Sequence, residues 1–463
     1  MSKILPSRDF DVTVPVVVIG AGACGLIAAL AAHDAGAEVV VLERDQRSSG
    51  STALSSGLIP ASGTRWQRAK DIDDPVEQFT VDIQTKAKGE ADPDLARTVA
   101  KESGRTLEWL TDEHGQNFVP LDGFLYPGHT VLRMHAHPEK TGEALVSGIL
   151  NAVIAAGIDV VTSAHVTALH GEPDGRVTGV EITRPSGETE ALGCGALVLA
   201  CNGYGGNVEM VAQHIPEMAD ALYFGHVGNQ GDAVIWGEAL GAEARHMGAY
   251  QGHGSVATPH GALITWAIMM EGGFQLNATG RRFSDENQGY SEQSVKVLAQ
   301  PGQVAWNIYD QRLHELALEF EDYRRAEDIG AIRRVETIEE LADLIDAPIN
   351  AVRESLSAVD DHAAGRAACP FGRDFTKAPS MDCRPYFVVK VTGALFHTQG
   401  GLSIDTTARV LRADGTHLPN LFAGGGAAVG VSGTSVHGYL SGNGLLTAVA
   451  FGRIAGESAA RLI

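Results

Sequence analysis

The stretch VPVVVIGAGACG, residues 14–25, determines the fold of this 463-residue chain. Its first half is apolar and mostly β-branched, which is typical of a strand buried on both faces of a parallel sheet. Residues 26–36 then predict a helix that ends at Gly36, and residues 38–42, EVVVL, predict a second strand. A glycine turn between a strand and a helix predicts a βαβ unit that binds a dinucleotide.

Each glycine of the turn has a separate physical role. Gly20 allows a tight turn, Gly22 lets the backbone approach a pyrophosphate, and Gly25 permits close packing of helix on strand. Ala23 in the same turn is also predicted to bind the cofactor, and the N-terminus of the helix that follows offers unpaired N–H groups and a positive dipole end to phosphates. Glu43 ends the second strand, where its carboxylate can bind both ribose hydroxyls and would repel a 2′-phosphate.

Two further segments favour FAD over a nicotinamide cofactor. Residues 51–57, STALSSG, supply small residues and hydroxyls, and residues 420–426, NLFAGGG, predict a strand and a glycine turn near the C-terminus. Residues 441–444, SGNG, open a helix over 445–454, whose N-terminus would stabilise negative charge at the N1–C2=O edge of a flavin. The cofactor-binding residues predicted from these segments are Ser51, Thr52, Ser56, Gly57, Gly426, Asn443 and Leu445. No histidine stands at Ser51–Thr52 to attach a flavin, so we expect FAD to be bound non-covalently.

The remaining sequence predicts a discontinuous α/β domain. Helices are predicted over 92–113, with Asp92 as N-cap and Pro93 at the first helical position, and over 141–157. Further predictions are a strand over 159–162, a β-meander over 165–192, a strand over 196–200, and a pair of helices over 338–345 and 349–364. We predict a Rossmann-like FAD-binding domain from residues 1–257 and 380–463, with an inserted α+β capping domain at 258–379.

The composition excludes several classes of function. The formal net charge of −22 argues against a nucleic-acid partner, which would require clustered Lys and Arg. The cysteines are scattered without a C-x-x-C pair, so we expect reduced thiols in the cytoplasm and no metal; they are Cys24, Cys194, Cys201, Cys369 and Cys383. No stretch is apolar for long enough to span a bilayer, and no signal peptide is recognised at the N-terminus.

In their shared order, several motifs resemble the fumarate reductase/succinate dehydrogenase flavoprotein superfamily. They are GAGACG, STALSSG, VLACNGYGGN, GNQGDAVIWGEALGAE, TGRRFSDE, FHTQGGLSID, NLFAGGG and FGRIAG. The resemblance covers nearly the whole chain and implies that Gly231, Asp232 and His397 contact FAD. It also implies that residues 258–379 form the capping domain.

The chain departs from the fumarate reductases where those enzymes clamp a dicarboxylate. Tyr290 stands where they have a proton-donating Arg, and Tyr439 stands where they have a clamping Arg. Phe396 replaces a histidine, and Trp266 replaces the Glu of a Thr-Glu pair. A dicarboxylate bound without cations would leave buried charge unpaired, at a cost of several kcal/mol. Fumarate and succinate are therefore poor substrate candidates.

The replacements resemble the 3-ketosteroid dehydrogenases, and the spacing of Tyr439, Ser441 and Gly444 is most similar to the Δ4 rather than the Δ1 branch. The resemblance implies that Tyr439 and the Gly444 N–H hold a substrate ketone as it gains enolate character. Tyr290 would remove the α proton while the β hydrogen leaves as hydride to flavin N5. A phenol with an ordinary pKa of about 10 is a poor base; a helix N-terminus and a hydrogen bond from Ser441 would have to lower the pKa of Tyr290.

Other residues are weaker candidates for the substrate pocket. Tyr126 would line the substrate entrance, and His253 and Phe396 occupy positions where fumarate reductases have substrate histidines. Tyr126 also fits a surface loop, and His253 also fits a structural histidine whose hydrogen bonds are satisfied. Arg281 and Arg282 are expected to pair with Glu286 or Asp285 in structural salt bridges.

Three functions remain open from the sequence. The first is an FAD-dependent dehydrogenase that desaturates a small hydrophobic cyclic ketone, with an electron acceptor that the sequence does not identify. The second is an FAD-dependent reductase of an activated alkene, similar to fumarate or urocanate reductase. The third is a non-catalytic flavin protein for electron transfer.

Overall fold

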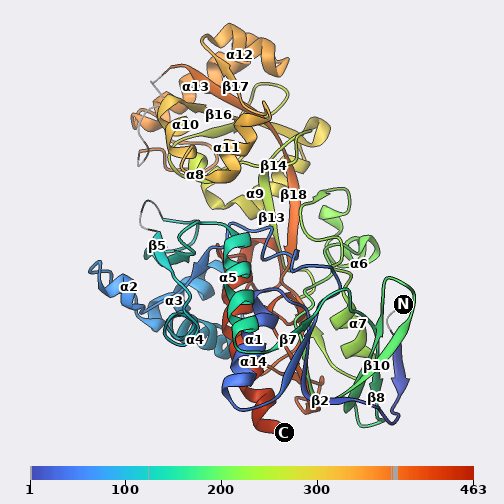
Figure 1. Cartoon of the computed structure of the whole chain (residues 1–463). Coiled ribbons are helices and arrows are strands. Elements are labelled where there is room, and N and C mark those ends of the chain that lie inside the picture. The colour runs from blue at the N-terminus through green and yellow to red at the C-terminus, as the bar shows by residue number, and fades with distance from the viewer. Residues whose placement is uncertain (1–2, 122, 124, 377, 379–383) are drawn as a thin grey trace. The chain divides into compact units, whose positions relative to one another are not determined.

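A computed structural model describes residues 3–121, 123, 125–376, 378 and 384–463 (Figure 1). These residues form two compact units. The first comprises Met1–Pro216, Gly225–Tyr250 and His397–Ile463, and the second comprises Glu217–Phe224 and Gln251–Phe396. The predicted capping domain, 258–379, lies within the range of the second unit. Cys383 and the predicted boundary at 379–380 lie outside the described residues.

Among the described residues, nine strands of the first unit form one sheet, seven of them in the order β1-β8-β9-β10-β2-β3-β7, with β21 beside β10 and β20 beside β21. The strands are β1 (Lys3–Pro6), β2 (Thr13–Ile19), β3 (Val39–Leu42), β7 (Asp159–Val161), β8 (His165–Gly171), β9 (Val177–Thr183), β10 (Thr189–Leu199), β20 (Arg409–Leu411) and β21 (His417–Ala423). Strands β7, β3, β2, β10 and β21 are parallel neighbours. The predicted βαβ unit and parallel sheet are therefore confirmed.

The predicted β-meander is present as β8, β9 and the first half of β10, which pair antiparallel. However, the meander and the predicted strand at 196–200 are not separate, because β10 runs without a break from Thr189 to Leu199. Gly193 and Gly195 lie in the middle of it, and a Cβ at Gly195 would come 2.9 Å from the carbonyl oxygen of Pro15. These glycines let β10 pass close to β2 instead of breaking the strand.

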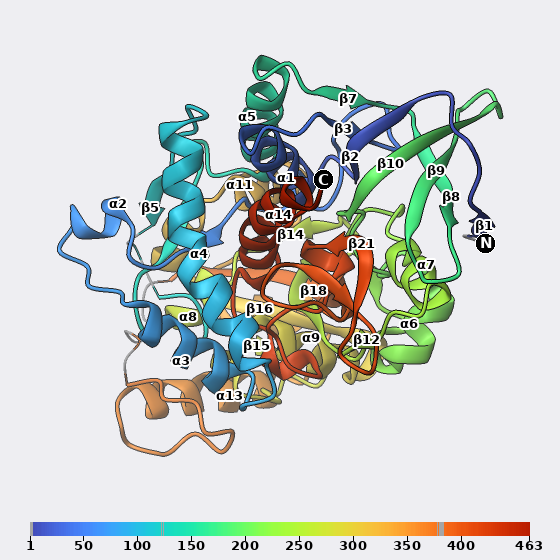
Figure 2. The ribbon, with the colours of Figure 1, turned by 90° about the horizontal axis from the view of Figure 1, so that it is seen from below.

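Helices α1 (Ala23–Asp34) and α14 (Asn443–Leu462) pack against each other although they lie at opposite ends of the sequence (Figure 2). A Cβ at Gly452 would lie 2.6 Å from the carbonyl oxygen of Cys24, and one at Gly456 would lie 2.1 Å from that of Ala28. Both contacts advance by four residues in the same direction, so the two helices run parallel. Residues 23–32 of α1 are all buried, as expected for a helix that is apolar on every side.

Two other helices of the first unit begin at side-chain N-caps. Helix α4 (Pro93–Asp112) begins as predicted, with the Asp92 side chain accepting from the backbone N–H groups of Asp94 and Leu95. Helix α5 (Gly142–Ala155) is capped by Thr141. The shorter elements are α2 (Arg65–Arg68), α3 (Val76–Lys86), α6 (Val208–His214), α7 (Asp232–Ala239), β4 (Ile59–Pro60), β5 (Val119–Leu121), β6 (Met134–Ala136), β12 (Ala244–Arg245) and β19 (Gly401–Leu402).

The second unit is built on a mostly antiparallel sheet with the order β14-β13-β18-β16-β15, and β11 and β17 also pair with β18. Its strands are β11 (Leu222–Tyr223), β13 (Tyr250–Ala257), β14 (Ala262–Leu263), β15 (Phe274–Leu276), β16 (Val304–Asp310), β17 (Arg333–Val335) and β18 (Tyr386–Thr398). Its helices are α8 (Ala267–Met270), α9 (Tyr290–Leu298), α10 (Gln311–Ala317), α11 (Glu321–Asp328), α12 (Ile338–Ile345) and α13 (Ile349–Ala363). The last two match the predicted helix pair.

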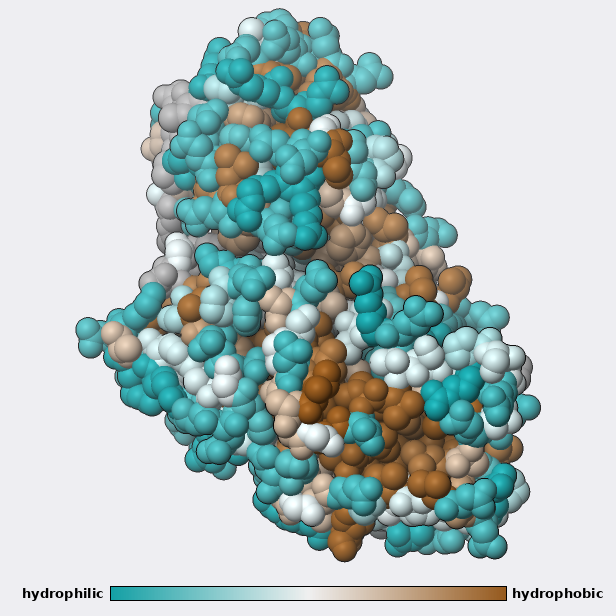
Figure 3. All heavy atoms as spheres, in the orientation of Figure 1, coloured by the Kyte–Doolittle hydropathy of each residue, from teal (hydrophilic) through white to brown (hydrophobic). Residues whose placement is uncertain are grey.

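Hydrophilic side chains cover much of the face drawn in Figure 3, and a hydrophobic area lies over the sheet of the first unit. In the described part of the chain, no helix is both long and apolar enough to cross a membrane.

The glycines of α14 provide a test of this packing. We expect Gly456→Ala to lower the free energy of unfolding by about 1–3 kcal/mol, because the new methyl group would meet the backbone of Ala28, which cannot move aside cheaply. Gly148→Ala in α5 is the matched control. Its methyl would meet only the side-chain oxygen of Gln116, and the helix gains about 1 kcal/mol in propensity. Urea unfolding of both variants would contradict this packing if Gly456→Ala were no less stable than Gly148→Ala.

Candidate functional site

The glycine turn between β2 and α1 has the geometry that a dinucleotide requires. Gly20 has φ +107°, and a Cβ on Gly25 would lie 1.9 Å from the Gly20 carbonyl oxygen. Around Gly22, by contrast, the nearest atom that a Cβ would meet is the Thr52 hydroxyl at 3.4 Å, so the backbone is open to a ligand there. The Thr52 hydroxyl also accepts from the Ala23 N–H at 3.1 Å and fixes the start of α1.

Glu43 lies at the end of β3, where the sequence predicted a ribose-binding carboxylate. Its oxygens accept from the backbone N–H groups of Ala21, at 2.8 Å, and Asp45, at 3.0 Å. Burial raises the pKa of Glu43 despite these hydrogen bonds. The carboxylate therefore ties β3 to the glycine turn, and its binding of a ribose stays a prediction.

Ser51 has two partners that the sequence did not identify. Its hydroxyl accepts from the side-chain amides of Asn202, at 2.7 Å, and Asn229, at 3.0 Å. Asn202 has φ +66° and lies three residues after the end of β10, at the carboxyl end of the parallel strands where ligands bind in open α/β sheets. The motif VLACNGYGGN contained this signal, because asparagine tolerates a left-handed conformation next to a strand end.

The N-terminus of α14 is the second helix end predicted to face the cofactor. Gly442, the N-cap, has φ +86° and offers no capping side chain. The Asn443 amide nitrogen donates to the Ser432 hydroxyl at 3.0 Å, but its oxygen Oδ1 is buried and has no hydrogen-bond partner among the described residues. A buried acceptor without a donor costs about 1–3 kcal/mol, which a donor on a bound group would relieve.

The two helix N-termini are also suitably staggered. Gly452 of α14 lies beside Cys24 of α1, so the first residue of α1, Ala23, lies beside residue 451. Helix α14 begins eight residues earlier, at Asn443, and its N-terminus therefore extends roughly 12 Å beyond that of α1 at 1.5 Å per residue. Two parallel positive ends displaced along one axis suit a long cofactor with phosphates in its middle and an electron-accepting ring at one end. The residues present therefore fit FAD.

His397 lies beside the start of α14 in the first unit. Its ring is 5.6 Å from that of Tyr439 in an edge-to-face arrangement, and a Cβ at Gly444 would lie 2.7 Å from it. Gln399, the variable residue of the H-T-x-G-G motif, donates to His397 Nδ1 at 3.1 Å and accepts from the Ser432 hydroxyl at 2.8 Å. Burial lowers the pKa of His397 to about 4, so the ring is neutral at physiological pH.

The remaining predicted residues of the first unit occupy loops and helix starts. Gly231 has φ +82° and is the N-cap of α7, which places Asp232 in its first turn. The Ser441 hydroxyl donates to the carbonyl oxygen of Pro127, next to Tyr126, at 3.3 Å. The positions of Ser56, Gly57, Gly426 and Leu445 are described, and their contact with FAD stays a prediction.

Tyr290, His253 and Phe396 come together in the second unit. The ring of His253 is stacked between those of Tyr290, at 4.8 Å, and Phe396, at 5.3 Å, and Phe396 in turn stacks on Phe224. The indole of Trp266 stands edge-on to His253, and its buried N–H has no partner among the residues that the structure describes. We call Tyr290, His253, Phe396, Phe224 and Trp266 the aromatic cluster.

His253 is neutral for a geometric reason. Its Nδ1 accepts from the backbone N–H of Ser255 at 3.2 Å, so the proton of the neutral ring is on Nε2. Burial lowers the pKa of His253 to about 3. The aromatic cluster therefore carries no charge from this histidine.

The buried arginine side chains are bound to carboxylates. Arg282 Nη2 lies 2.6 Å from Glu286, as predicted, and Arg373, which the sequence analysis overlooked, lies 2.9 Å from the same carboxylate. In the first unit, Arg133 binds Asp74 at 2.8 Å and Asp82 at 2.5 Å. Arg281 instead pairs with Glu354 on the surface, so its predicted pairing with Glu286 or Asp285 is wrong.

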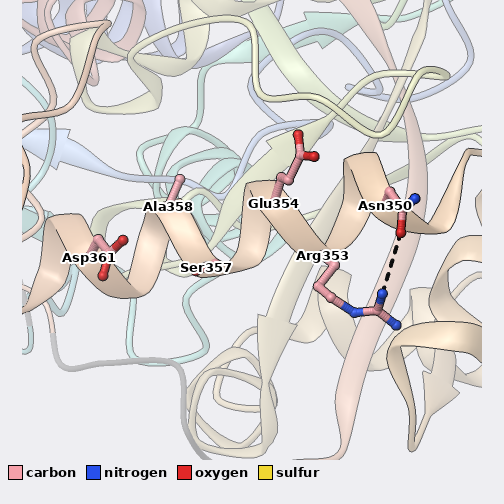
Figure 4. Close-up of a pocket in the computed structure, with 6 residues that line it drawn as sticks. All are labelled: Asn350, Arg353, Glu354, Ser357, Ala358 and Asp361. Atoms are coloured by element: carbon pink, nitrogen blue, oxygen red, sulfur yellow. Dashed lines mark hydrogen bonds between the residues drawn. The ribbon is translucent and has the colours of Figure 1, made fainter.

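A surface hollow on α13 is not the candidate site. It is lined by Asn350, Arg353, Glu354, Ser357, Ala358 and Asp361, which all lie on this one helix (Figure 4). Arg353 donates to Asn350 at 3.4 Å within it. None of the residues predicted to bind cofactor or substrate lines this hollow.

The described part of the chain holds no cluster of three or more histidine, cysteine or acidic side chains suited to a metal ion. Cys24, Cys194, Cys201 and Cys369 are free thiols, and burial raises the pKa of the first three to about 12. These three thiols are therefore poor nucleophiles.

Comparison with known proteins agrees with this geometry. Residues 15–445 match a family model described as FAD binding domain. The protein named Probable fumarate reductase Ifc3, from Shewanella frigidimarina, is 32% identical over 453 residues, which cover 97% of this chain and 75% of that protein. The urocanate reductase of Eggerthella lenta is 28% identical over 471 residues, which cover 99% of this chain and 77% of that protein.

Two solved structures share the fold. The open conformation of a flavocytochrome c3 fumarate reductase superposes with a TM-score of 0.82 at 30% identity and covers 98% of this chain and 79% of that one. The 3-ketosteroid-Δ4-(5α)-dehydrogenase of Rhodococcus jostii RHA1, in complex with 4-androstene-3,17-dione, superposes with a TM-score of 0.78 at 24% identity over 99% of both chains.

Asn443 tests the fit of the cofactor. We expect Asn443→Ala to weaken FAD binding by roughly tenfold, since the variant loses an acceptor worth about one hydrogen bond. Titration of the apoprotein with FAD, followed by flavin fluorescence, measures the dissociation constant. Thr447→Val, one turn further along α14, is the control, because that hydroxyl donates only to carbonyls of its own helix. Equal affinities in the two variants would contradict a role for Asn443.

His253 gives a pH dependence of stability. Its pKa is lowered on folding, so the unfolded chain binds the extra proton, and stability falls as pH drops below the unfolded value of about 6.5 towards 3. Between pH 7.5 and 5, we expect this one group to cost about 2 kcal/mol. Between pH 7.5 and 5, the free energy of unfolding of His253→Gln, measured with urea, should therefore fall by about 2 kcal/mol less than that of the wild type. If the two proteins showed the same pH dependence, His253 would not be buried and neutral.

Proposed function

Since the chain belongs to the FAD-binding family of fumarate reductase/succinate dehydrogenase flavoproteins, we propose that it is an FAD-dependent dehydrogenase that desaturates a cyclic ketone. The substrate class we propose is a neutral, hydrophobic 3-ketosteroid or a related cyclic ketone. FAD binding and membership of an oxidoreductase family are the premise, and the substrate and the direction of the reaction are the proposal.

The observation that carries the proposal is the absence of a positively charged side chain at the two tyrosine positions. Tyr290 and Tyr439 stand where the resemblance places a proton-donating and a clamping arginine in fumarate reductases. The buried guanidinium groups of Arg133, Arg282 and Arg373 are already bound to carboxylates. A dicarboxylate would gain no cation from these groups, whereas a neutral ketone needs none.

The first unit supplies groups that suit the ketone oxygen. Tyr439 lies against the neutral ring of His397, and Gly444 lies in the first turn of α14, where backbone N–H groups have no partner within the helix. In the proposed reaction, the Tyr439 hydroxyl and the Gly444 N–H donate to the ketone oxygen. Their hydrogen bonds strengthen as that oxygen gains negative charge, and this makes the α proton more acidic.

The second unit supplies the proposed base, Tyr290, and the uncharged rings packed around it. Tyr290 accepts the α proton, directly as a phenolate or through a relay, and the electron pair of the broken C–H bond enters the new double bond. Bound FAD supplies the acceptor for the hydride that leaves the β carbon. The stacked rings of Tyr290, His253 and Phe396 carry no positive charge, so the surroundings of the proposed base suit a neutral substrate better than an anion.

A second function has independent support from sequence similarity. The two curated relatives described above are named for the reduction of activated alkenes, at 32% and 28% identity. In an alkene reductase, the substrate would receive a proton and a hydride instead of releasing them, and the same tyrosines would act as proton donors. The substituted arginine positions favour the dehydrogenase, so we place the reductase second.

The direction of the reaction can be tested on the oxidised and the reduced protein. We expect a saturated cyclic 3-ketone, added anaerobically, to bleach the visible flavin band. An alkene that reoxidises dithionite-reduced protein, without any bleaching by ketones, would favour the reductase. A flavin inert to both treatments would favour the non-catalytic electron-transfer protein.

We expect Tyr290→Phe to lower kcat by about 10²–10⁴-fold while FAD remains bound, because the variant lacks the proposed base. Tyr309→Phe is the matched control: this tyrosine is buried in the same unit and its hydroxyl lies 2.7 Å from that of Tyr323. The control should lose about 1 kcal/mol of stability and keep its turnover. Full activity of Tyr290→Phe in a steady-state assay with an artificial acceptor would exclude the proposed role.

A further inference from the structure

A buried chain of hydrogen bonds connects the segment of His129 and Arg133 to the loop before α14. His129 Nε2 lies 2.9 Å from the carbonyl oxygen of Ser441, and His129 Nδ1 lies 3.1 Å from Nη1 of Arg133. His129 and Arg133 are both buried. Ser441 stands between Tyr439 and Gly442, the N-cap of α14.

The partners determine which nitrogen of His129 carries the proton. Arg133 can only donate, so Nδ1 of His129 must accept, and the carbonyl of Ser441 can only accept, so Nε2 must donate. Both contacts are satisfied only by the neutral ring protonated at Nε2. Burial, reinforced by the charge of Arg133, lowers the pKa of His129 to about 3, so this state persists throughout the neutral range.

The other end of the chain is firmly anchored. The Arg133 guanidinium binds Asp74 through Nε and Nη2, at 3.0 and 2.8 Å, and binds Asp82 through Nη1. Its face lies 4.3 Å from the ring of Phe79. Asp82 also accepts from the backbone N–H of Thr130 at 2.9 Å. The two aspartates bind the edge of the guanidinium and the Phe79 ring packs on its face, so Arg133 can direct Nη1 towards His129 in only one orientation.

The loop itself has little freedom to find another position. A Cβ at Gly442 would lie 2.6 Å from the ring of Pro60, and one at Gly128 would lie 2.6 Å from the side chain of Leu440. Gly442 has φ +86°, so the direction of the Ser441 carbonyl and the first turn of α14 are set by the same few dihedral angles. The unpartnered, buried Oδ1 of Asn443 lies in that first turn and independently marks it as facing a ligand.

We propose that His129 is a positioning residue, which through the Ser441 carbonyl holds the first turn of α14 in place and thereby sets the reduction potential of the bound FAD. The inference rests on one part of the proposed function, the placement of this helix N-terminus at the flavin, and is independent of the identity of the substrate. A correctly aimed helix N-terminus stabilises the negative charge of the reduced flavin and raises its potential.

The experiment compares three variants of the FAD-loaded protein. His129→Phe removes both hydrogen bonds. His129→Gln keeps one acceptor and one donor, so it can bond Arg133 and Ser441 at the same time. His135→Phe is the matched control, because His135 is equally buried and lies 2.9 Å from the carbonyl oxygen of Arg133 and 2.9 Å from the Thr64 hydroxyl. The midpoint potential is measured by equilibration with a reference dye, and the FAD content by absorbance.

We expect the potential of His129→Phe to fall by at least about 30 mV, a tenfold change in the equilibrium constant of a two-electron reduction. His129→Gln should recover most of that shift, and His135→Phe should keep the wild-type potential. If His129→Phe yields no FAD-loaded protein, His129→Asn takes its place, since its shorter amide reaches only one of the two partners.

A wild-type potential in the His129 variant, or an equal shift in His135→Phe, would overturn the inference. If the wild-type protein oxidised no ketone, the proposed function as a dehydrogenase would be contradicted instead. That result would leave the measured potentials, and the role of His129, unaffected.

Discussion

The parallel contact between α1 and α14 is the constraint on which the rest of the first unit depends. Two glycines of α14 let it approach the backbone of α1 so closely that a single methyl group would collide with Cys24 or Ala28. This contact fixes the stagger of the two helix N-termini, one at the glycine turn and one next to Tyr439 and His397. The positions of positive partial charge along the cofactor site are therefore a result of helix packing.

Much of the fold could be predicted from the sequence because its signals are local. The apolar strand before Gly20 and the cap at Asp92 and Pro93 each determine the local structure within a few residues. The predicted bounds were wrong where contacts between distant segments determine how far a strand or helix extends. Glycines that would end a strand in isolation instead let β10 pass close to β2, and α14 extends to Leu462, beyond the predicted 454, because α1 covers its apolar face.

The candidate site was predictable in its residue types but not in its partners. Motifs pointed to Ser51, His397 and Asn443, but they did not show which side chains bind these residues; the two partners of Ser51, for example, are more than 150 residues away along the chain. The neutral state of the buried histidines follows from desolvation and from which neighbours donate, and neither can be read from spacing along the chain. A buried pair such as Arg133 and Asp82 is visible only once the chain is folded.

The division of the chain has a consequence for its biosynthesis. All of the second unit, up to Phe396, leaves the ribosome before the last segment of the first unit, His397–Ile463, is translated. Strand β21, which pairs with β10, and helix α14, which packs on α1, both belong to that last segment. Until this segment is synthesised, β10 and α1 lack these partners and their apolar surfaces stay exposed. Chains that stop before this segment would therefore expose the apolar faces of β10 and α1, and exposed apolar surface of this kind promotes aggregation.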